Sequence, residues 1–376
     1  MSLFAEELKK LLIKRKLLLL LLLALAVKSG FLLVGAHQHV LFQDQSLQSE
    51  YLSYMAVLEG SLNPEKEEFL LTEKSRADES DARLSEAFAQ LSTGQITVPQ
   101  FDGIVAGESA YQNKKPVIEH LYRQYQYIAA DPGSRYFIDP VGWSGLLADE
   151  LPDYLLILAV IVIGTLVFYC EDESRMPALN LTAANGKARL AAAKILITSL
   201  VCLILTIGFF MVDLAFVYLF NGLSGFGFPI QSIPFYGSSG KALSLGSLLL
   251  RLLGLRVLGV MLLVSLVLLL YLCSRSAIAT LTTSLAIAVI PPFVFGMNGL
   301  IFRLPLPMGY LIGNGFYRGS ESLWLDDGKQ VSLKYLFQEV PDTWFAALVL
   351  VGIVLIAAML VACVLRFASG KSRGVT

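Results

Sequence analysis

The sequence predicts an all-α membrane protein with six transmembrane helices and an extracellular helical domain. Three observations lead to this prediction. Hydrophobic residues make up 55% of the 376 residues and charged residues only 16%, whereas a soluble protein of this length carries roughly a quarter charged residues. The apolar residues gather in runs of about 17–25, the length that crosses a bilayer as a helix. Between the first two runs lies an acidic segment, 42–153, with 8 Lys and Arg against 19 Asp and Glu, a balance of −11.

The same composition excludes several classes of protein. The mean hydropathy is +0.65, and the chain contains 22 Phe and 15 Tyr residues. This composition excludes a disordered chain and an ordinary cytosolic enzyme. The basic residues lie at the edges of apolar runs rather than in one patch, so no nucleic-acid partner is expected. The runs are continuous rather than alternating, which excludes a strand-based barrel. Six runs are expected to span: Leu17–Leu41, Tyr154–Tyr169, Ile195–Phe220, Val257–Cys273, Ala277–Phe295 and Trp344–Leu365.

The chain begins with a segment, 1–16, that is expected to lie on the cytoplasmic membrane surface as an amphipathic helix. Its apolar face is made by Phe4, Leu8, Leu11 and Leu12. The first span, 17–41, follows. Leu17–Ala26 also resembles a cleavable signal peptide, with Ala24-Leu25-Ala26 as the cleavage site. The apolar run resumes after Lys28 and continues to Leu41, so a retained anchor is the preferred interpretation.

The extracellular domain, 42–153, is expected to be a helical hairpin or small bundle. Asn63-Pro64 followed by acidic residues predicts a helix start. An apolar residue recurs every seven positions, at Leu70, Ala77, Leu84 and Leu91. Phe88 is expected to add to the same apolar face, and Gly94 can end the helix. A second amphipathic stretch, 117–128, follows. The five Tyr residues between 111 and 136 could form a substrate-facing surface, but packing within the bundle is preferred.

The rest of the chain, 154–376, is expected to hold five further spans. The second span is short and is expected to borrow a turn from Leu146–Leu151. Ser244–Arg256 is interpreted as a short re-entrant or interfacial helix before the fourth span. Pro291-Pro292 should end or kink the fifth helix.

Basic residues near span ends predict the orientation, because cytoplasmic loops carry the excess of Lys and Arg. One cluster, Lys9–Lys16, precedes the first span, and a second lies at Arg175–Lys194. Both termini are therefore expected in the cytoplasm of a multi-pass protein of the cell membrane. Some basic residues run against the rule: Lys241, Arg251, Arg256, Arg303, Arg318, Lys329 and Lys334.

Two charges fall inside spans, Lys28 in the first and Asp213 in the third. A charge in the bilayer is costly unless it is paired or hydrated, so both are candidates for a functional pathway. At ~1.5 Å per residue, Lys28 is roughly 17 Å and Asp213 roughly 27 Å from the cytoplasmic ends of their spans. The two residues could form a pair across the interior of the subunit. Alternatively, the Lys28 side chain could extend to the membrane–water interface, with Asp213 also lying at an interface.

Catalytic motifs are missing, so no enzymatic activity and no cofactor are expected on this chain. Gly237–Ala242 looks like a phosphate-binding loop but lacks the first Gly and the Ser or Thr after Lys241. His37 and His39 are isolated from His120, so a metal site is not favoured. The four cysteines, Cys170, Cys202, Cys273 and Cys363, all lie within or at the ends of spans. They are interpreted as packing residues.

The most informative segment joins the second and third spans. Acids open a short helix, Met176 and Leu179 share its face, Asn185-Gly186 breaks it, and basic residues mark the next membrane entry. The order Glu171, Met176, Leu179, Thr182, Gly186, Arg189 and Lys194 resembles the corresponding loop of ABC exporter permeases of the type 2 family.

That resemblance implies a permease subunit of an ATP-driven exporter that moves a peptide, antimicrobial or lipid-like substrate outward. It implies a separate ABC ATPase subunit that binds ATP and Mg, and a homodimer of permeases or a pair with a related permease in the lipid bilayer. The loop 171–194 would be the coupling element, with these contact residues for the ATPase: Glu171, Asp172, Met176, Leu179, Asn180, Gly186 and Arg189. The alternatives are a non-transporting receptor or immunity protein whose extracellular domain binds a ligand, and a membrane enzyme.

Overall fold

The computed structural model describes residues 9, 17–35, 41–147, 152–173, 186–295, 300–319, 322–324, 330–332 and 340–369. The described part is almost entirely helical, which confirms the all-α class. Four helices are long and apolar enough to cross a membrane: α2 (Leu17–Gly35), α8 (Gly186–Phe220), α9 (Leu245–Ser274) and α12 (Asp342–Ser369). Two more, α7 (Tyr154–Glu173) and α10 (Ala277–Phe295), hold shorter apolar stretches. The chain is therefore a multi-pass helical membrane protein.

The remaining elements are short or lie outside the apolar bundle. They are α3 (Gln45–Leu58), α4 (Pro64–Ser92), α5 (Val98–Ala129), α6 (Pro140–Leu147), η4 (Ile230–Ser232), η5 (Pro234–Tyr236), η6 (Leu300–Arg303), α11 (Pro307–Ile312) and η7 (Asn314–Phe316). Two three-residue strands, β1 (Ser322–Trp324) and β2 (Gln330–Ser332), pair antiparallel with Leu323 opposite Val331.

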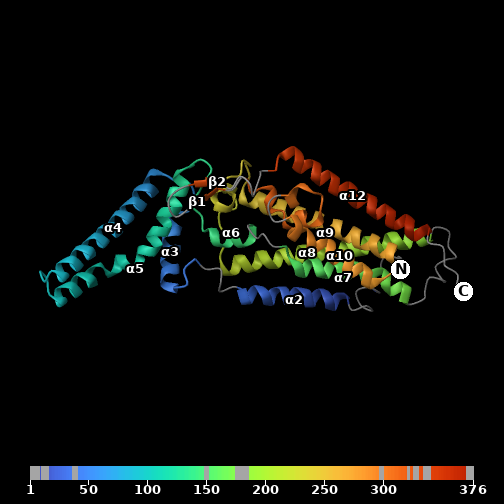
Figure 1. The fold of residues 1–376 in the computed structure, drawn as a ribbon, viewed down its shortest axis with the longest axis horizontal. Helices are drawn as coiled ribbons and strands as arrows, with labels where there is room; N and C mark the ends of the chain where they lie inside the picture. The colour runs from blue at the N-terminus through green and yellow to red at the C-terminus, as the bar shows by residue number, and fades with distance from the viewer. Residues whose placement is uncertain are drawn as a thin grey trace.

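The molecule is elongated, with the apolar helices along its long axis and the α4–α5 hairpin projecting at one end (Figure 1). Helices α2, α8 and α10 run toward that end, whereas α7, α9 and α12 run away from it (Figure 1). Helix α9 is central, because it packs against α7, α8, α10, α11 and α12. By contrast, the main contacts of α2 are with α7 and α8. Many of its side chains are exposed.

The hairpin forms where its sequence signals indicate. The Asn63 side chain accepts a hydrogen bond from the Lys66 backbone N–H at 2.8 Å, and α4 begins at Pro64. Gly94 has a φ of +73°, the left-handed conformation that glycine adopts at low cost, and the chain turns there toward α5. Leu70 and Ala77 are buried. Phe88 is 66% exposed, so its predicted place in the core is wrong.

Residues 42–147, called the outer domain because they lie outside the apolar bundle, contact the connection between α8 and α9, residues 221–244, which contains η4 and η5. The Tyr127 hydroxyl donates to the Gln231 carbonyl at 2.6 Å, and the Tyr136 N–H donates to Ser232 Oγ at 3.0 Å. The Trp143 indole N–H donates to the Ser224 carbonyl at 2.9 Å. The tyrosines named here therefore pack the domain onto its base, which favours the packing interpretation for them.

Two expectations about helix boundaries are wrong, and a third is wrong in one of its two alternatives. Helix α7 does not extend back toward Leu146–Leu151, because it begins at Tyr154. It extends instead at its C-terminal end, to Glu173. The stretch Ser244–Arg256 is no separate re-entrant helix: α9 is continuous from Leu245, with the Ser244 hydroxyl accepting from the Ser247 N–H. Helix α10 does not end at Pro291-Pro292 but continues to Phe295, four residues past the first proline. Neither proline has an N–H to donate to the carbonyl four residues earlier, so α10 continues through this turn without those two backbone hydrogen bonds.

Candidate functional site

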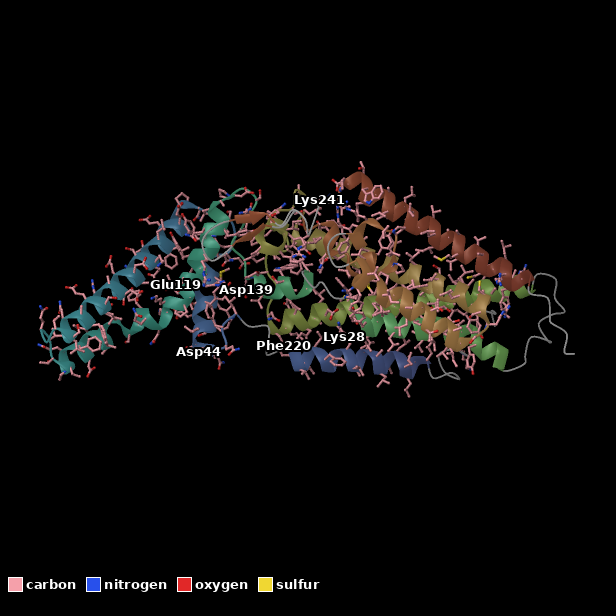
Figure 2. The ribbon with its side chains drawn as sticks, in the orientation of Figure 1. Lys28, Asp44, Glu119, Asp139, Phe220 and Lys241 are labelled. Carbon is pink, nitrogen blue, oxygen red and sulfur yellow. The ribbon has the colours of Figure 1, made fainter. Side chains whose placement is uncertain are left out.

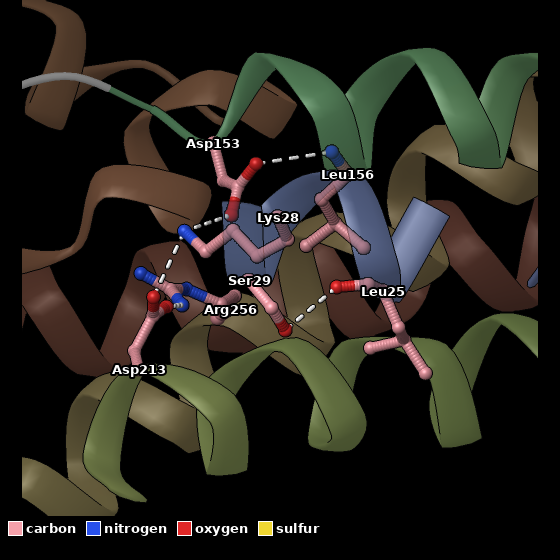
Figure 3. Close-up of polar contacts among 7 residues, drawn as sticks. All are labelled: Leu25, Lys28, Ser29, Asp153, Leu156, Asp213 and Arg256. Carbon is pink, nitrogen blue, oxygen red and sulfur yellow. Dashed lines mark hydrogen bonds and ion pairs between the residues drawn. The ribbon is translucent and has the colours of Figure 1, made fainter. Parts of the chain in front are cut away.

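A cluster of four charged side chains lies between the apolar helices (Figure 3). Lys28 on α2 points toward Asp213 on α8, with Nζ 2.9 Å from Asp213 Oδ1. The same Nζ lies 2.8 Å from Oδ2 of Asp153, the residue before α7. Arg256 on α9 completes the cluster, with Nη1 3.5 Å from Asp213 Oδ2. Of the two arrangements that the sequence allows, the structure therefore contains the pairing of Lys28 with Asp213.

The position of the cluster follows from the helix boundaries. Lys28 lies seven residues before Gly35, the last residue of α2, and Asp213 lies seven residues before Phe220, the last of α8. At ~1.5 Å per residue, both lie about 10 Å inside the helix ends that face the outer domain. Figure 2 shows Lys28 among the apolar helices, well away from Asp44 and Glu119 of the outer domain.

The cluster is balanced in charge and largely removed from solvent. Two cations face two carboxylates, and the exposed fractions of the side chains are 17% for Lys28, 10% for Asp153, 16% for Asp213 and 23% for Arg256. Arg256 also lies over the Phe210 ring, 5.8 Å from its centroid. A charge in a low-dielectric environment persists only with such compensation. The arrangement ties four segments together through one shared network.

Asp153 serves this network and its own helix at once. Its Oδ1 accepts a hydrogen bond from the Leu156 backbone N–H at 3.1 Å, the geometry of a helix N-cap, while Oδ2 contacts Lys28. Neither Asp153 nor Arg256 was predicted from the sequence as a member of this cluster. Asp153 lies directly before an apolar run, and an Asp followed by such a run is a cap signal. Arg256 was counted among the residues that flank a span, but it lies inside α9.

Other basic residues that run against the orientation rule also have partners at this end of the molecule. Lys241 forms an ion pair with Asp342 and donates to the Val340 carbonyl at 3.1 Å. The Arg318 guanidinium lies over the Phe235 ring, 4.1 Å from its centroid. Each of these cations is held by neighbouring groups and is not a solvated loop charge.

The predicted coupling loop is only partly within the described residues. Glu171 and Asp172 lie in the last turn of α7, and Arg189 is exposed on the first turn of α8. Gly186 is the first residue of α8 and is not among the glycines with positive φ. The short helix that Asn185-Gly186 is expected to end lies outside the described residues. Met176, Leu179 and Asn180 lie outside the described residues, as do Phe4, Leu8, Leu11 and Leu12.

Three half-buried polar side chains, His120, Tyr127 and Asp139, lie in the second half of the outer domain. Burial raises the pKa of the Asp139 carboxyl, although the Val141 N–H donates to it at 3.0 Å. Burial lowers the pKa of His120, which packs against the rings of Phe42 and Tyr51. Burial also raises the pKa of Tyr127 to about 12. Within the described residues, no group of three or more His, Cys, Asp or Glu side chains could hold a metal ion.

Comparison of the chain with family models, curated proteins and solved structures gave no match. The geometry of the site and the sequence pattern are therefore the grounds for a functional interpretation.

Proposed function

We propose that this chain is the permease subunit of an ATP-driven exporter of the ABC type 2 kind. Six helices, α2, α7, α8, α9, α10 and α12, span the cell membrane, and residues 42–153 form a domain outside it. Two permeases, identical or related, work with a separate ATPase that binds ATP and Mg. The exporter moves a peptide, antimicrobial or lipid-like substrate outward.

The arrangement of connections supports this proposal most directly. At the end opposite the outer domain, α9 and α10 are joined by a turn of two residues, Arg275 and Ser276. Helix α7 ends at Glu173 and α8 begins at Gly186 at that same end, so a longer stretch of chain separates these two helices (Figure 1). A permease without its own ATPase must receive mechanical work through a cytoplasmic surface. We propose that residues 171–194, whose sequence resembles the coupling loop of the type 2 family, form that surface.

The distribution of charge supports the orientation. Arg189 near the start of α8, Arg275 after α9 and Arg366 near the end of α12 all lie at the end opposite the outer domain (Figure 1). The acidic residues gather on α3, α4 and α5 at the other end. Positive residues at one set of helix ends favour that set on the cytoplasmic side. Both termini then lie in the cytoplasm.

The proposal is tested by replacing Leu179 with Asp. A charge in the apolar contact should abolish co-purification of an ABC ATPase encoded beside this gene, or uncouple its ATP hydrolysis from substrate, because a few residues dominate such interfaces. Leu71→Asp is the matched control: Leu71 is 41% exposed on α4, far from the loop. If Leu179→Asp still co-purifies with the ATPase and substrate still stimulates ATP hydrolysis as in the wild type, residues 171–194 are not the coupling element.

The rival function is a non-transporting receptor or immunity protein whose outer domain binds a ligand. This alternative needs no ATPase. If wild-type chain purified from membranes carries no ATPase and no ABC ATPase gene accompanies it, the receptor function replaces the exporter function.

A further inference from the structure

A hollow opens between the three long helices of the outer domain, with a volume of about 480 Å³. Each helix contributes to its walls. The lining residues are Ser53, Tyr54 and Val57 of α3, Phe69 and Glu73 of α4, and Ala110, Tyr111 and Lys114 of α5. A volume of this size lies within the range of about 300–1,000 Å³ that is typical of ligand sites.

The walls combine aromatic rings with charges that already have partners. The Tyr54 and Phe69 rings lie 5.9 Å apart. The Tyr54 hydroxyl donates to Glu73 at 2.7 Å, and Arg76 lies 3.0 Å from the other Glu73 oxygen. On the opposite wall Lys114 pairs with Glu50 at 2.6 Å. The interior therefore presents no unpaired charge from these groups, and its accessible surface is suited to an apolar or aromatic group.

Val57 shows that this surface is open to a partner. It is 57% exposed although it is a large apolar side chain at the mouth of an aromatic hollow. In an outer domain that faces water, no lipid covers it. An apolar group entering the hollow would bury Val57 together with the Tyr54 and Phe69 rings, and burial of apolar surface favours binding.

The charge of the surrounding domain selects the partner. Residues 42–153 carry a balance of −11, and α4 carries Glu65, Glu67 and Glu68 in the two turns that precede Glu73 of the hollow. A surface of one sign attracts partners of the opposite sign and speeds their association. An acidic peptide is disfavoured by the same field.

We propose that this hollow binds a cationic peptide, seating one aromatic or branched apolar side chain between Tyr54, Val57 and Phe69 while flanking Lys or Arg residues lie against the acidic helices. The binding requires the outer domain to face water but does not require an ATPase partner. It would supply substrate capture in an exporter and ligand recognition in a receptor.

The test uses the full chain in nanodiscs of phosphatidylcholine, whose neutral surface does not attract cationic peptides, and isothermal titration with three amidated pentapeptides. KKWKK should bind, and its affinity should fall as ionic strength rises. KKSKK, which lacks the apolar anchor, should bind at least about tenfold more weakly. EEWEE should not bind. Empty nanodiscs give the background.

Two variants of equal charge locate the site. Val57→Arg fills the mouth of the hollow with a cation and should weaken KKWKK binding at least about tenfold. Val98→Arg adds the same charge at an exposed position, 61% accessible, at the start of α5, and should change the affinity by less than about threefold. Unchanged thermal unfolding of both variants confirms that they fold. Equal loss in both variants, equal binding of KKSKK, binding of EEWEE, or no binding of KKWKK to wild type would each overturn the proposal. None of these results depends on Leu179 or on an ATPase.

Discussion

Replacing Lys28 with Met removes the cation that joins α2 to both α7 and α8. Asp153 then loses the 2.8 Å contact and Asp213 the 2.9 Å contact with Nζ. Breaking a buried ion pair on one side costs about 3–5 kcal/mol, because the remaining charge stays buried without compensation. Arg256 still lies 3.5 Å from Asp213, which places the expected loss near the lower end, about 3 kcal/mol.

Asp213→Asn tests the same network from the other side. Lys28 keeps Asp153 as its partner, and the Arg256 contact that is lost is the longer one, 3.5 Å, so the expected loss is smaller, about 1–3 kcal/mol. In the double variant Lys28→Met/Asp213→Asn, Asp153 lacks its cation and Arg256 lacks its carboxylate, so one charge of each sign remains in the cluster. The double loss should fall short of the sum of the single losses by about 0.5–3 kcal/mol, the range found for residues in one network.

The assay is equilibrium unfolding in mixed detergent micelles, with denaturing detergent as the variable and tryptophan fluorescence as the signal. Lys74→Met is the control, since Lys74 pairs with Asp78 one turn away on the exposed face of α4. A pair of that kind contributes about 0.3–0.5 kcal/mol. Strictly additive losses for Lys28→Met and Asp213→Asn, or a Lys28→Met loss no larger than the Lys74→Met loss, would refute the reasoning.

Three further predictions concern single positions. Asp153→Asn should keep the cap on the Leu156 N–H and lose the ion pair, so Asp153→Ala should unfold more easily than Asp153→Asn by about 1 kcal/mol in the same assay; equal losses would show that the cap contributes nothing. Burial raises the pKa of Asp139 above 3.8, so its contribution to stability is full below the unfolded value and is lost as the pH rises through the folded value. Asp139→Asn, which keeps an acceptor for the Val141 N–H, should therefore melt at a higher temperature than wild type at pH 7. That gain should shrink as the pH is lowered, and a gain independent of pH would contradict the assignment. A Cβ on Gly164 of α7 would lie 2.9 Å from Val267 Cγ1 on α9, so Gly164→Ala should cost about 1–3 kcal/mol by overpacking. Gly254→Ala on α9, where a Cβ meets nothing within 4 Å, should cost nothing.

Local signals predicted the outer hairpin well because each signal acts within a few residues. The Asn63 cap, Pro64 and Gly94 fix the two ends of α4 through hydrogen bonds and φ preferences inside their own turns. Apolar runs likewise located the spanning helices. Their ends were harder to predict, because Arg251 and Arg256 interrupt the run that α9 continues through.

The charge cluster could be predicted only in part, because its members come from four distant segments. Lys28 and Asp213 stand out as charges inside apolar runs, so hydropathy finds them. Asp153 is 125 residues from Lys28 in the chain, and its cap role gives no indication of a cation partner. Arg256 looked like a flanking residue because the start of α9 was placed at Val257 rather than Leu245.

The composition of α2 explains why this cluster matters for the fold. Its contacts with α7 and α8 are made mainly by leucines, with Leu17 and Ala24 buried and Leu20, Leu21 and Leu25 partly buried. In a bilayer a leucine surface is as well solvated by lipid tails as by another helix, so leucine contacts alone give little driving force for association. Lys28 is different, because lipid offers it no counter-charge, whereas the bundle offers Asp153 and Asp213. The ion pairs therefore determine where α2 docks. A variant that removes them should leave α2 inserted in the membrane but no longer fixed against α8. A Cβ at Gly208 would lie 3.6 Å from Leu25 Cδ2, so a disulfide between Leu25→Cys and Gly208→Cys should form more slowly in Lys28→Met than in the otherwise wild-type chain.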